Sequence, residues 1–455
     1  MNSMLANAGS LVYAARYPKV QKAVAVLALV LLSAWLGYQV ARDYFTAVEL
    51  MVAAAIVAVS IRWPRQALLM AVPATLLPID LVGTSGQLLI VAALTIGWLV
   101  EMLAGRGHVY PWEHGLLAGF GAWLVLAYFV DGVHIESQLS AEHDLATLLA
   151  GLWLCGMAIS IGPTRGQLLA VGALSAAAVS VAAILDPAHS GVGRIALLGL
   201  NSNYVGAALA LGAVASLAAL IHNRRNPIWI ATGVACVIGI RASGSRGAIV
   251  MLLAGVAVLG LLGRPRWIQL TVVAVAATVV IALPGFTDEA LTLLIGPRTA
   301  ADFAASNIDR TNAGLTALRY AVANPVFGVG YGQFAALAAR DPLLAEYVAT
   351  HNDYLRLAAE SGFPAALLLI AVVGLALRTG RPLRRTETAM VVTYAVSLLF
   401  GNFLSNLSVS APFWLWLGLS LHVSAERSAA TRETAREVSI RSQGAAMRTV
   451  RFPAE

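Results

Sequence analysis

The 455-residue sequence has few charged side chains: 12% of its residues are Asp, Glu, Lys or Arg, whereas 59% are hydrophobic. Soluble domains carry roughly 25% charged residues, so the composition excludes a soluble globular protein and indicates an integral membrane protein. Cysteine is also scarce. Cys155 and Cys236 are the two cysteines, and each lies within an apolar run. A disulfide framework and a thiolate metal site are therefore not expected.

Sequence patterns for nucleotides and metals are missing as well. The chain has no Walker A pattern, no DxD-like pattern for a metal-bound nucleotide sugar, and no histidine and carboxylate spacing typical of a metal site. Neither a cofactor nor a metal ion is expected. The formal net charge of +7 does not indicate nucleic acid as a partner, because membrane proteins concentrate arginine on their cytoplasmic side for topological reasons.

The long apolar segments predict an all-α, polytopic inner-membrane protein with about 12–14 transmembrane helices, since one span needs about 20 apolar residues. The segments lie near residues 22–41, 44–61, 66–82, 84–105, 113–130, 145–162, 167–186, 197–221, 227–241, 247–263, 266–285, 355–378, 386–404 and 407–423. Pro73 and Pro78 interrupt the third segment. The count falls to about twelve if a pair of segments is re-entrant.

Arginine and lysine predict the orientation, because most of them fall in both tails and in alternate loops. The positive-inside rule then places both termini in the cytoplasm, with membrane lipids around the spans. The chain divides into N-terminal transmembrane helices (1–194), helices leading into the catalytic region (195–285), one large helical periplasmic loop (286–354), C-terminal transmembrane helices (355–423) and a cytoplasmic tail (424–455).

Several arginines nevertheless fall on the outer side, where topology disfavours them, and an anionic ligand is the simplest reason for them. Arg246 follows Ser243-Gly244-Ser245 at the outer start of a helix. Free backbone N–H groups at a helix N-terminus, together with a guanidinium, form an anion site. The alternative is an arginine that extends to the lipid headgroups.

A second outer cluster follows Arg194. Asn201, Ser202, Asn203 and Tyr204 stand inside the apolar segment near residues 197–221, where polar side chains are costly unless they line a cavity. Asn201 and Tyr204 are three residues apart and share a helix face. Hydrogen bonding between helices is the competing interpretation.

The longest polar interruption runs from Asn307 to Gly362. The pattern predicts a helix that starts near Asn307, with Asp309 as its cap and Arg310 in its first turn, and that stops at Asn324-Pro325. Arg319 lies nine residues after Arg310 and so on the opposite face. Arg310 is therefore expected in the site, while Arg319 pairs with an acidic neighbour or with lipid. A glycine-rich turn over residues 327–332 follows, and it contains Tyr331.

His351 stands at the end of this interruption, beside Asn352 and close to Tyr354. An imidazole with a pKa near 6.5 is a suitable general base for a hydroxyl nucleophile at neutral pH. A structural histidine at the membrane interface is the alternative.

These residues resemble the sequence motifs of the O-antigen ligase and polymerase superfamily, over roughly residues 195–405. The matching stretches are Ser245-Arg246-Gly247, Arg310 with Asn324-Pro325-Val326-Phe327-Gly328-Val329-Gly330-Tyr331-Gly332-Gln333-Phe334, and His351-Asn352-Asp353-Tyr354-Leu355 with Glu360-Ser361-Gly362. Gly314 stands where an aromatic residue is common, and Pro364 where a glycine is common. Neither position carries expected chemistry.

The resemblance implies a metal-independent, inverting glycosyltransferase at the outer face of the inner membrane. Its donor would be O-antigen on undecaprenyl diphosphate, and for a ligase the acceptor would be lipid A–core oligosaccharide. The catalytic residues would be His351 as base with Arg246 and Arg310. The substrate-binding residues would be Arg194, Asn201, Tyr204, Ser245, Tyr331, Asn352 and Tyr354.

Three other functions stay open on the sequence. An O-antigen polymerase uses the same donor with a second lipid-linked glycan as acceptor, and a protein O-oligosaccharyltransferase shares the motifs. From a different class, a transporter of lipid-linked glycans would bind the diphosphate and pass it on. A transporter should show related halves or charges deep in several spans, and neither is evident. The compact loop and the lack of an appended soluble domain favour the ligase.

Overall fold

The computed structural model describes residues 54–75, 79–130, 138–185, 189–190, 194–195, 201–222, 226–262, 300–342, 344, 348–378 and 385–423. Within these ranges the regular structure is helical, apart from one antiparallel pair of two-residue strands, β1 (His189–Ser190) and β2 (Arg194–Ile195). The all-α class is therefore confirmed. Both tails and the expected spans over 22–41 and 266–285 lie outside the described residues, so the orientation of the termini stays a prediction.

In the described part of the chain, six helices are long and apolar enough to cross a membrane. They are α5 (Ile79–Leu103), α6 (Pro111–Val130), α7 (Gln138–Ile161), α8 (Arg165–Leu185), α9 (Ser202–His222) and α16 (Asp353–Arg378). Shorter apolar helices are α10 (Ile228–Ser243), α11 (Arg246–Leu261) and the helix Leu407–Val423. The chain is thus a multi-pass membrane protein, and most described helices begin and end within a few residues of the expected spans.

The expected span over residues 66–82 is wrong. This stretch forms two short helices, α3 (Pro64–Leu69) and α4 (Ala71–Thr75), and α5 begins at Ile79. Neither short helix approaches the roughly 20 residues that a crossing requires. Pro64 starts α3 at its N-terminal end, and Pro73 removes a backbone donor in α4, so the apolar composition of this stretch does not give one continuous helix.

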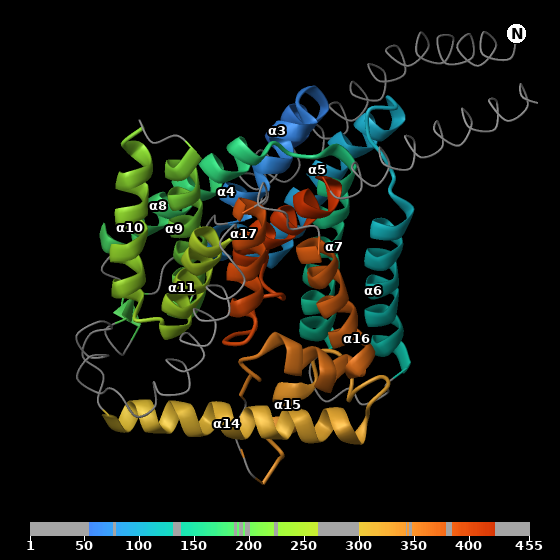
Figure 1. Cartoon of the computed structure of the whole chain (residues 1–455). Helices are drawn as coiled ribbons and strands as arrows, with labels where there is room; N and C mark the ends of the chain where they lie inside the picture. Colours follow the sequence, from blue (N-terminus) through green and yellow to red (C-terminus); the bar gives the residue numbers. More distant parts are fainter. Residues whose placement is uncertain are drawn as a thin grey trace, which may run out of the picture.

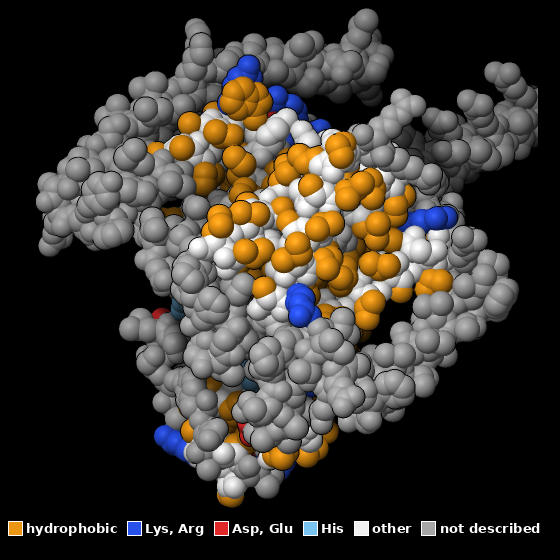
Figure 2. Space-filling view, turned by 90° about the vertical axis from the view of Figure 1, so that its left-hand side faces the viewer, with side chains coloured by type: hydrophobic (Ala, Val, Ile, Leu, Met, Phe, Trp, Pro, Cys, Tyr) orange, Lys and Arg blue, Asp and Glu red, His pale blue; other side chains and the backbone are white. Residues whose placement is uncertain are grey.

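Helix α9 is the centre of one half of the bundle and packs against α8, α10, α11 and α17 (Arg385–Ser397). Its buried positions are mostly alanine and glycine, and small residues allow membrane helices to approach closely. The outward face of the bundle, beyond α9, carries larger apolar side chains, as expected of a surface in contact with lipid (Figure 2). On α10 these exposed residues are Ile228, Ile230, Val234, Val237 and Ile238.

Helix α14 (Ala300–Ala323) runs crosswise at one end of the upright helices, with α15 (Phe334–Ala338) beside it (Figure 1). Ala313, Ala317 and Ala321 recur every four residues, are fully buried, and form the stripe on which α14 packs. The predicted start at Asn307 is wrong: the helix begins at Ala300, so Arg310 lies well inside it and Asp309 is not its cap. The predicted stop before Pro325 is confirmed.

The glycine-rich turn over residues 327–332 is seated on a kink in α16. The Val329 N–H donates to the Ala359 carbonyl at 2.8 Å, and the Phe363 N–H donates to the Pro325 carbonyl at 2.9 Å. Gly362 breaks the helix there with φ = 78°, a conformation that favours glycine. The break also accommodates Pro364, which lacks a backbone donor. This explains why a proline is tolerated in α16.

Candidate functional site

A pocket lies where the start of α11 meets α14 and the loop after α17. It has about 410 Å³ of empty volume, and its lining residues are Asn203, Gly244, Ser245, Arg246, Gly247, Ala248, Met251, Arg310, Phe400 and Phe403. The structure thus brings Arg246 and Arg310 together from two separate sequence motifs, as expected. Two arginines line the pocket, and none of these lining residues is acidic.

The turn between α10 and α11 gives this pocket its backbone wall. Gly244 ends α10 in the left-handed conformation with φ = 59°. Ser245 then caps α11, because its hydroxyl accepts a hydrogen bond from the Ala248 N–H at 3.4 Å. The N-terminus of a helix carries a partial positive charge. The first turn of α11 therefore adds backbone donors and positive potential to the two arginines.

His351 lies in the short segment before α16 and is half-buried. Its φ is +53°, a left-handed conformation that is uncommon for a residue with a side chain. Burial lowers the pKa of its imidazole below the ordinary 6.5, the charge of Arg310 lowers it further, and Asp309 opposes the shift. The ring is therefore neutral at pH 7 and able to accept a proton. His351 is not among the residues that line the pocket, but the charge of Arg310, which does line it, acts on the imidazole.

Four of the expected substrate-binding residues use their side chains inside the fold. The Asn201 carboxamide accepts from the Asn203 and Tyr204 N–H groups at 2.9 and 3.1 Å and caps α9, so it does not stand within a span. The Asn352 carboxamide accepts from the Leu355 N–H at 3.0 Å and caps α16. The hydroxyls of Tyr204 and Tyr354 donate to the carbonyls of Asn402 and Ala395 at 3.1 and 3.0 Å. These contacts brace the helices around the pocket, and none of the four residues lines it.

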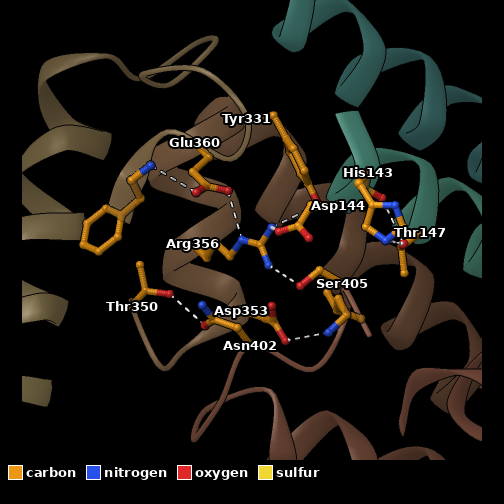
Figure 3. A network of polar contacts seen from close by, with 12 residues as sticks. His143, Asp144, Thr147, Tyr331, Thr350, Asp353, Arg356, Glu360, Asn402 and Ser405 are labelled. Carbon is orange, nitrogen blue, oxygen red and sulfur yellow. Dashed lines mark hydrogen bonds and ion pairs between the residues drawn. The ribbon is translucent and has the colours of Figure 1, made fainter. Parts of the chain in front are cut away.

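Tyr331 belongs to a second polar cluster, around Arg356 (Figure 3). The Arg356 guanidinium contacts Glu360 at 3.0 Å and Asp144 at 3.1 Å, and it donates to Ser405 at 2.7 Å and to the Tyr331 hydroxyl at 3.3 Å. Tyr331 is 1% exposed, and burial raises the pKa of its phenol far above the usual range. We call these five residues the Arg356 cluster. It joins α7, the glycine-rich turn, α16 and the loop after α17.

Arg319 and Arg194 are two further arginines that the sequence analysis considered. Arg319 lies on the face of α14 away from the pocket and pairs with Asp341, which confirms the expected acidic partner. Arg194 is in β2, where its backbone pairs with Ser190; its side chain lies outside the described residues, so its expected role stays a prediction.

The sequence interpretation did not assign several of the pocket residues to the site, among them Asn203, Phe400 and Phe403. Asn203 was part of the polar group at the start of α9, so its side chain was a visible candidate. Phe400 and Phe403 were assigned to an expected span over 386–404, whereas α17 ends at Ser397 and they lie in the following loop. Aromatic residues in an apolar run carry no signal that separates a pocket wall from a lipid-facing surface.

Comparison with known protein families agrees with this geometry. Residues 231–370 match the family model described as O-antigen ligase. The matched region contains Arg246, α14 with Arg310, the glycine-rich turn, His351 and the first half of α16. No curated protein matches the chain.

Proposed function

Because residues 231–370 match the family model described as O-antigen ligase, we propose that the chain is an O-antigen ligase of the O-antigen ligase/polymerase superfamily. In this proposal it is a metal-independent, inverting glycosyltransferase that moves O-antigen glycan from undecaprenyl diphosphate to lipid A–core oligosaccharide. The single observation that carries the proposal is the pocket that holds Arg246 and Arg310 at the N-terminus of α11.

The pocket suits the diphosphate of the donor. Guanidinium groups bind phosphate oxygens with paired, charge-assisted hydrogen bonds, and a helix N-terminus adds backbone donors. In this proposal the diphosphate occupies the pocket, and the glycan and the polyprenyl chain extend out of it, towards solvent and lipid respectively.

The chemical step is one displacement at the anomeric carbon. The acceptor hydroxyl oxygen forms the new glycosidic bond while His351 takes the hydroxyl proton. The bond between the anomeric carbon and the diphosphate oxygen breaks, and undecaprenyl diphosphate leaves with the electron pair. Arg246 and Arg310 stabilise the negative charge that develops on this leaving group. Attack from the face opposite the leaving group inverts the anomeric centre.

The substrates place this reaction at the outer surface of the inner membrane. Lipid-linked O-antigen and lipid A–core both present their sugars there, and we propose that the pocket end of the bundle, crossed by α14, faces the periplasm. The arginine bias of the sequence supports this orientation, because it puts both tails in the cytoplasm and the 286–354 region on the opposite side.

The test is a transfer assay with purified protein, lipid-linked O-antigen and lipid A–core, without added metal or nucleotide. We expect glycan to move to lipid A–core, as seen by a gel shift, and to be lost in His351→Ala and Arg246→Ala. Elongation of the lipid-linked glycan without transfer to lipid A–core would identify a polymerase instead. Donor binding that Arg246→Ala abolishes, without any transfer, would point to a transporter.

A further inference from the structure

We propose that Asn402, through its hydrogen bond with Thr350, is a positioning residue that holds His351 in place against the arginine pocket. The inference rests on the proposed glycosyl transfer. It concerns the loop over residues 398–406, which follows α17 and lies outside the residues that match the family model.

The conformation of His351 requires such support. With φ = +53°, it is the one described residue other than glycine that has a positive φ. Such a conformation persists where the surrounding contacts hold it. On one side of His351, the Asn352 carboxamide caps α16 through the Leu355 N–H at 3.0 Å. On the other side, the Thr350 hydroxyl donates to the Asn402 carboxamide oxygen at 2.9 Å.

Further hydrogen bonds join the same loop to the start of α16. The Asp353 carboxylate accepts from the Phe403 N–H at 2.6 Å and from the Leu404 N–H at 3.1 Å. The Asp353 N–H donates to the Leu398 carbonyl at 2.8 Å. Figure 3 shows the Thr350–Asn402 contact close to Asp353, with Arg356 on the next turn of α16. These bonds fasten the loop to the segment that carries His351.

The loop also forms one wall of the pocket. Phe400 and Phe403 line it beside Arg246 and Arg310. Asn402 lies between the two phenylalanines in the sequence, and its carbonyl accepts from the Tyr204 hydroxyl of α9 at 3.1 Å. Asn402 thus connects three parts of the site: α9, the pocket wall and the residue next to His351. Losing its bond to Thr350 should misplace the base while leaving the arginines where they are.

The decisive variants change the hydroxyl of Thr350, which is 2% exposed. Thr350→Val keeps the shape and removes the donor, and Thr350→Ser retains the donor. A misplacement of a catalytic group by about 1 Å can cost about 10²-fold in rate. We therefore expect Thr350→Val and Asn402→Ala to lower kcat by about 10–100-fold, with little change in KM for the lipid-linked donor. Thr350→Ser should keep most of the activity.

The matched control is Thr232→Val in α10. Thr232 is also buried, and its hydroxyl bonds within the α9–α10 contact, next to Ser216. It should leave both kinetic constants near those of the unchanged protein. If Thr350→Val and Asn402→Ala keep kcat within about twofold, the inference is wrong although the proposed function stands.

A second readout does not depend on transfer. NMR titration of the His351 ring reports its environment directly, with His351→Gln used to assign the signal. We expect Thr350→Val to bring the lowered pKa back towards 6.5, because a displaced ring is less buried and lies farther from Arg310. An unchanged titration would overturn the inference. If the unchanged protein transfers no glycan, the proposed function fails, and this titration still decides whether Asn402 positions His351.

Discussion

The molecule contains two arginine sites with opposite characters. In the Arg356 cluster, the arginine side chain is 6% exposed and is enclosed by Asp144, Glu360, Ser405 and Tyr331 (Figure 3). In the pocket, Arg246 and Arg310 are lining residues together with a serine and two phenylalanines, and none of the lining residues is acidic. The first arginine is held by two carboxylates of the fold, whereas the other two line a pocket.

This difference shows that an arginine expected on the outer side of the membrane is not by itself evidence for ligand binding. A guanidinium has five N–H donors, and Arg356 directs its Nε and both Nη atoms to partners on three other segments and on its own helix. Arg319 is likewise engaged with Asp341. The predicted orientation disfavours arginine on this side of the membrane, yet Arg319 and Arg356 each pair with a carboxylate of the fold. The functional prediction therefore rests on the pocket and not on the number of arginines.

The largest expected effect on stability is from Arg356→Ala. Removing one partner of a buried ion pair costs about 3–5 kcal/mol of unfolding free energy, since Glu360, at 4% side-chain exposure, would lose its ion-pair partner. Denaturant or thermal unfolding in detergent measures this loss. The double variant Arg356→Met/Glu360→Met removes both charges and should lose less than the single variant. If the double variant is the less stable of the two, the cluster is not held by its charges.

The second effect is on transfer and separates the pocket from the cluster. Arg246→Ala removes one stabilising group for the leaving diphosphate, which should lower the transfer rate by about 10²–10³-fold. Its unfolding free energy should change by less than about 1 kcal/mol. Arg246→Lys should recover only part of the rate, because an ammonium group does not reproduce the paired hydrogen bonds of a guanidinium. Full activity in Arg246→Ala would remove this residue from the proposed mechanism.

Much of the fold and part of the site follow from the sequence, for physical reasons. Long apolar runs must be helical in a bilayer, so α10 lies at Ile228–Ser243 where 227–241 was expected. Ser245 and Arg246 were visible as a helix start, because their local pattern determines the cap. The Arg356 cluster was not visible, because Asp144 is 212 residues away in the sequence. A pairing of that range depends on how α7 and α16 pack.

One local signal in the sequence was misleading. Asp309 looked like a helix cap next to Arg310, but the residues from Ala300 onwards already form the helix. The hydroxyls of Tyr331 and Tyr354 contact Arg356 and the Ala395 carbonyl within the protein. The expected role of these two tyrosines in substrate binding stays a prediction.

A third prediction tests the contact between the glycine-rich turn and the kink in α16, two segments that both contribute residues to the Arg356 cluster. Gly362→Ala places a methyl group against the Val326 carbonyl at φ = 78°. The combined strain should cost about 1–3 kcal/mol of unfolding free energy. Gly374→Ala is the control: the same helix offers open space there, and alanine should stabilise the helix by up to about 1 kcal/mol. Equal unfolding free energies of the two variants would contradict the view that the kink at Gly362 needs glycine to seat the turn.

The smallest expected effect is a shift in the pH dependence of transfer, and it tests whether the pocket charge acts on the base. His351 must be deprotonated to take the acceptor proton, so kcat/KM should fall as the pH drops through its pKa, below the ordinary 6.5. Arg310→Gln removes a charge that lowers this pKa, so the acidic limb should move to higher pH. Asp309→Asn removes a charge that raises it, so the limb should move to lower pH. Limbs that move in the same direction in both variants would show that the pocket charges do not govern the titration of His351.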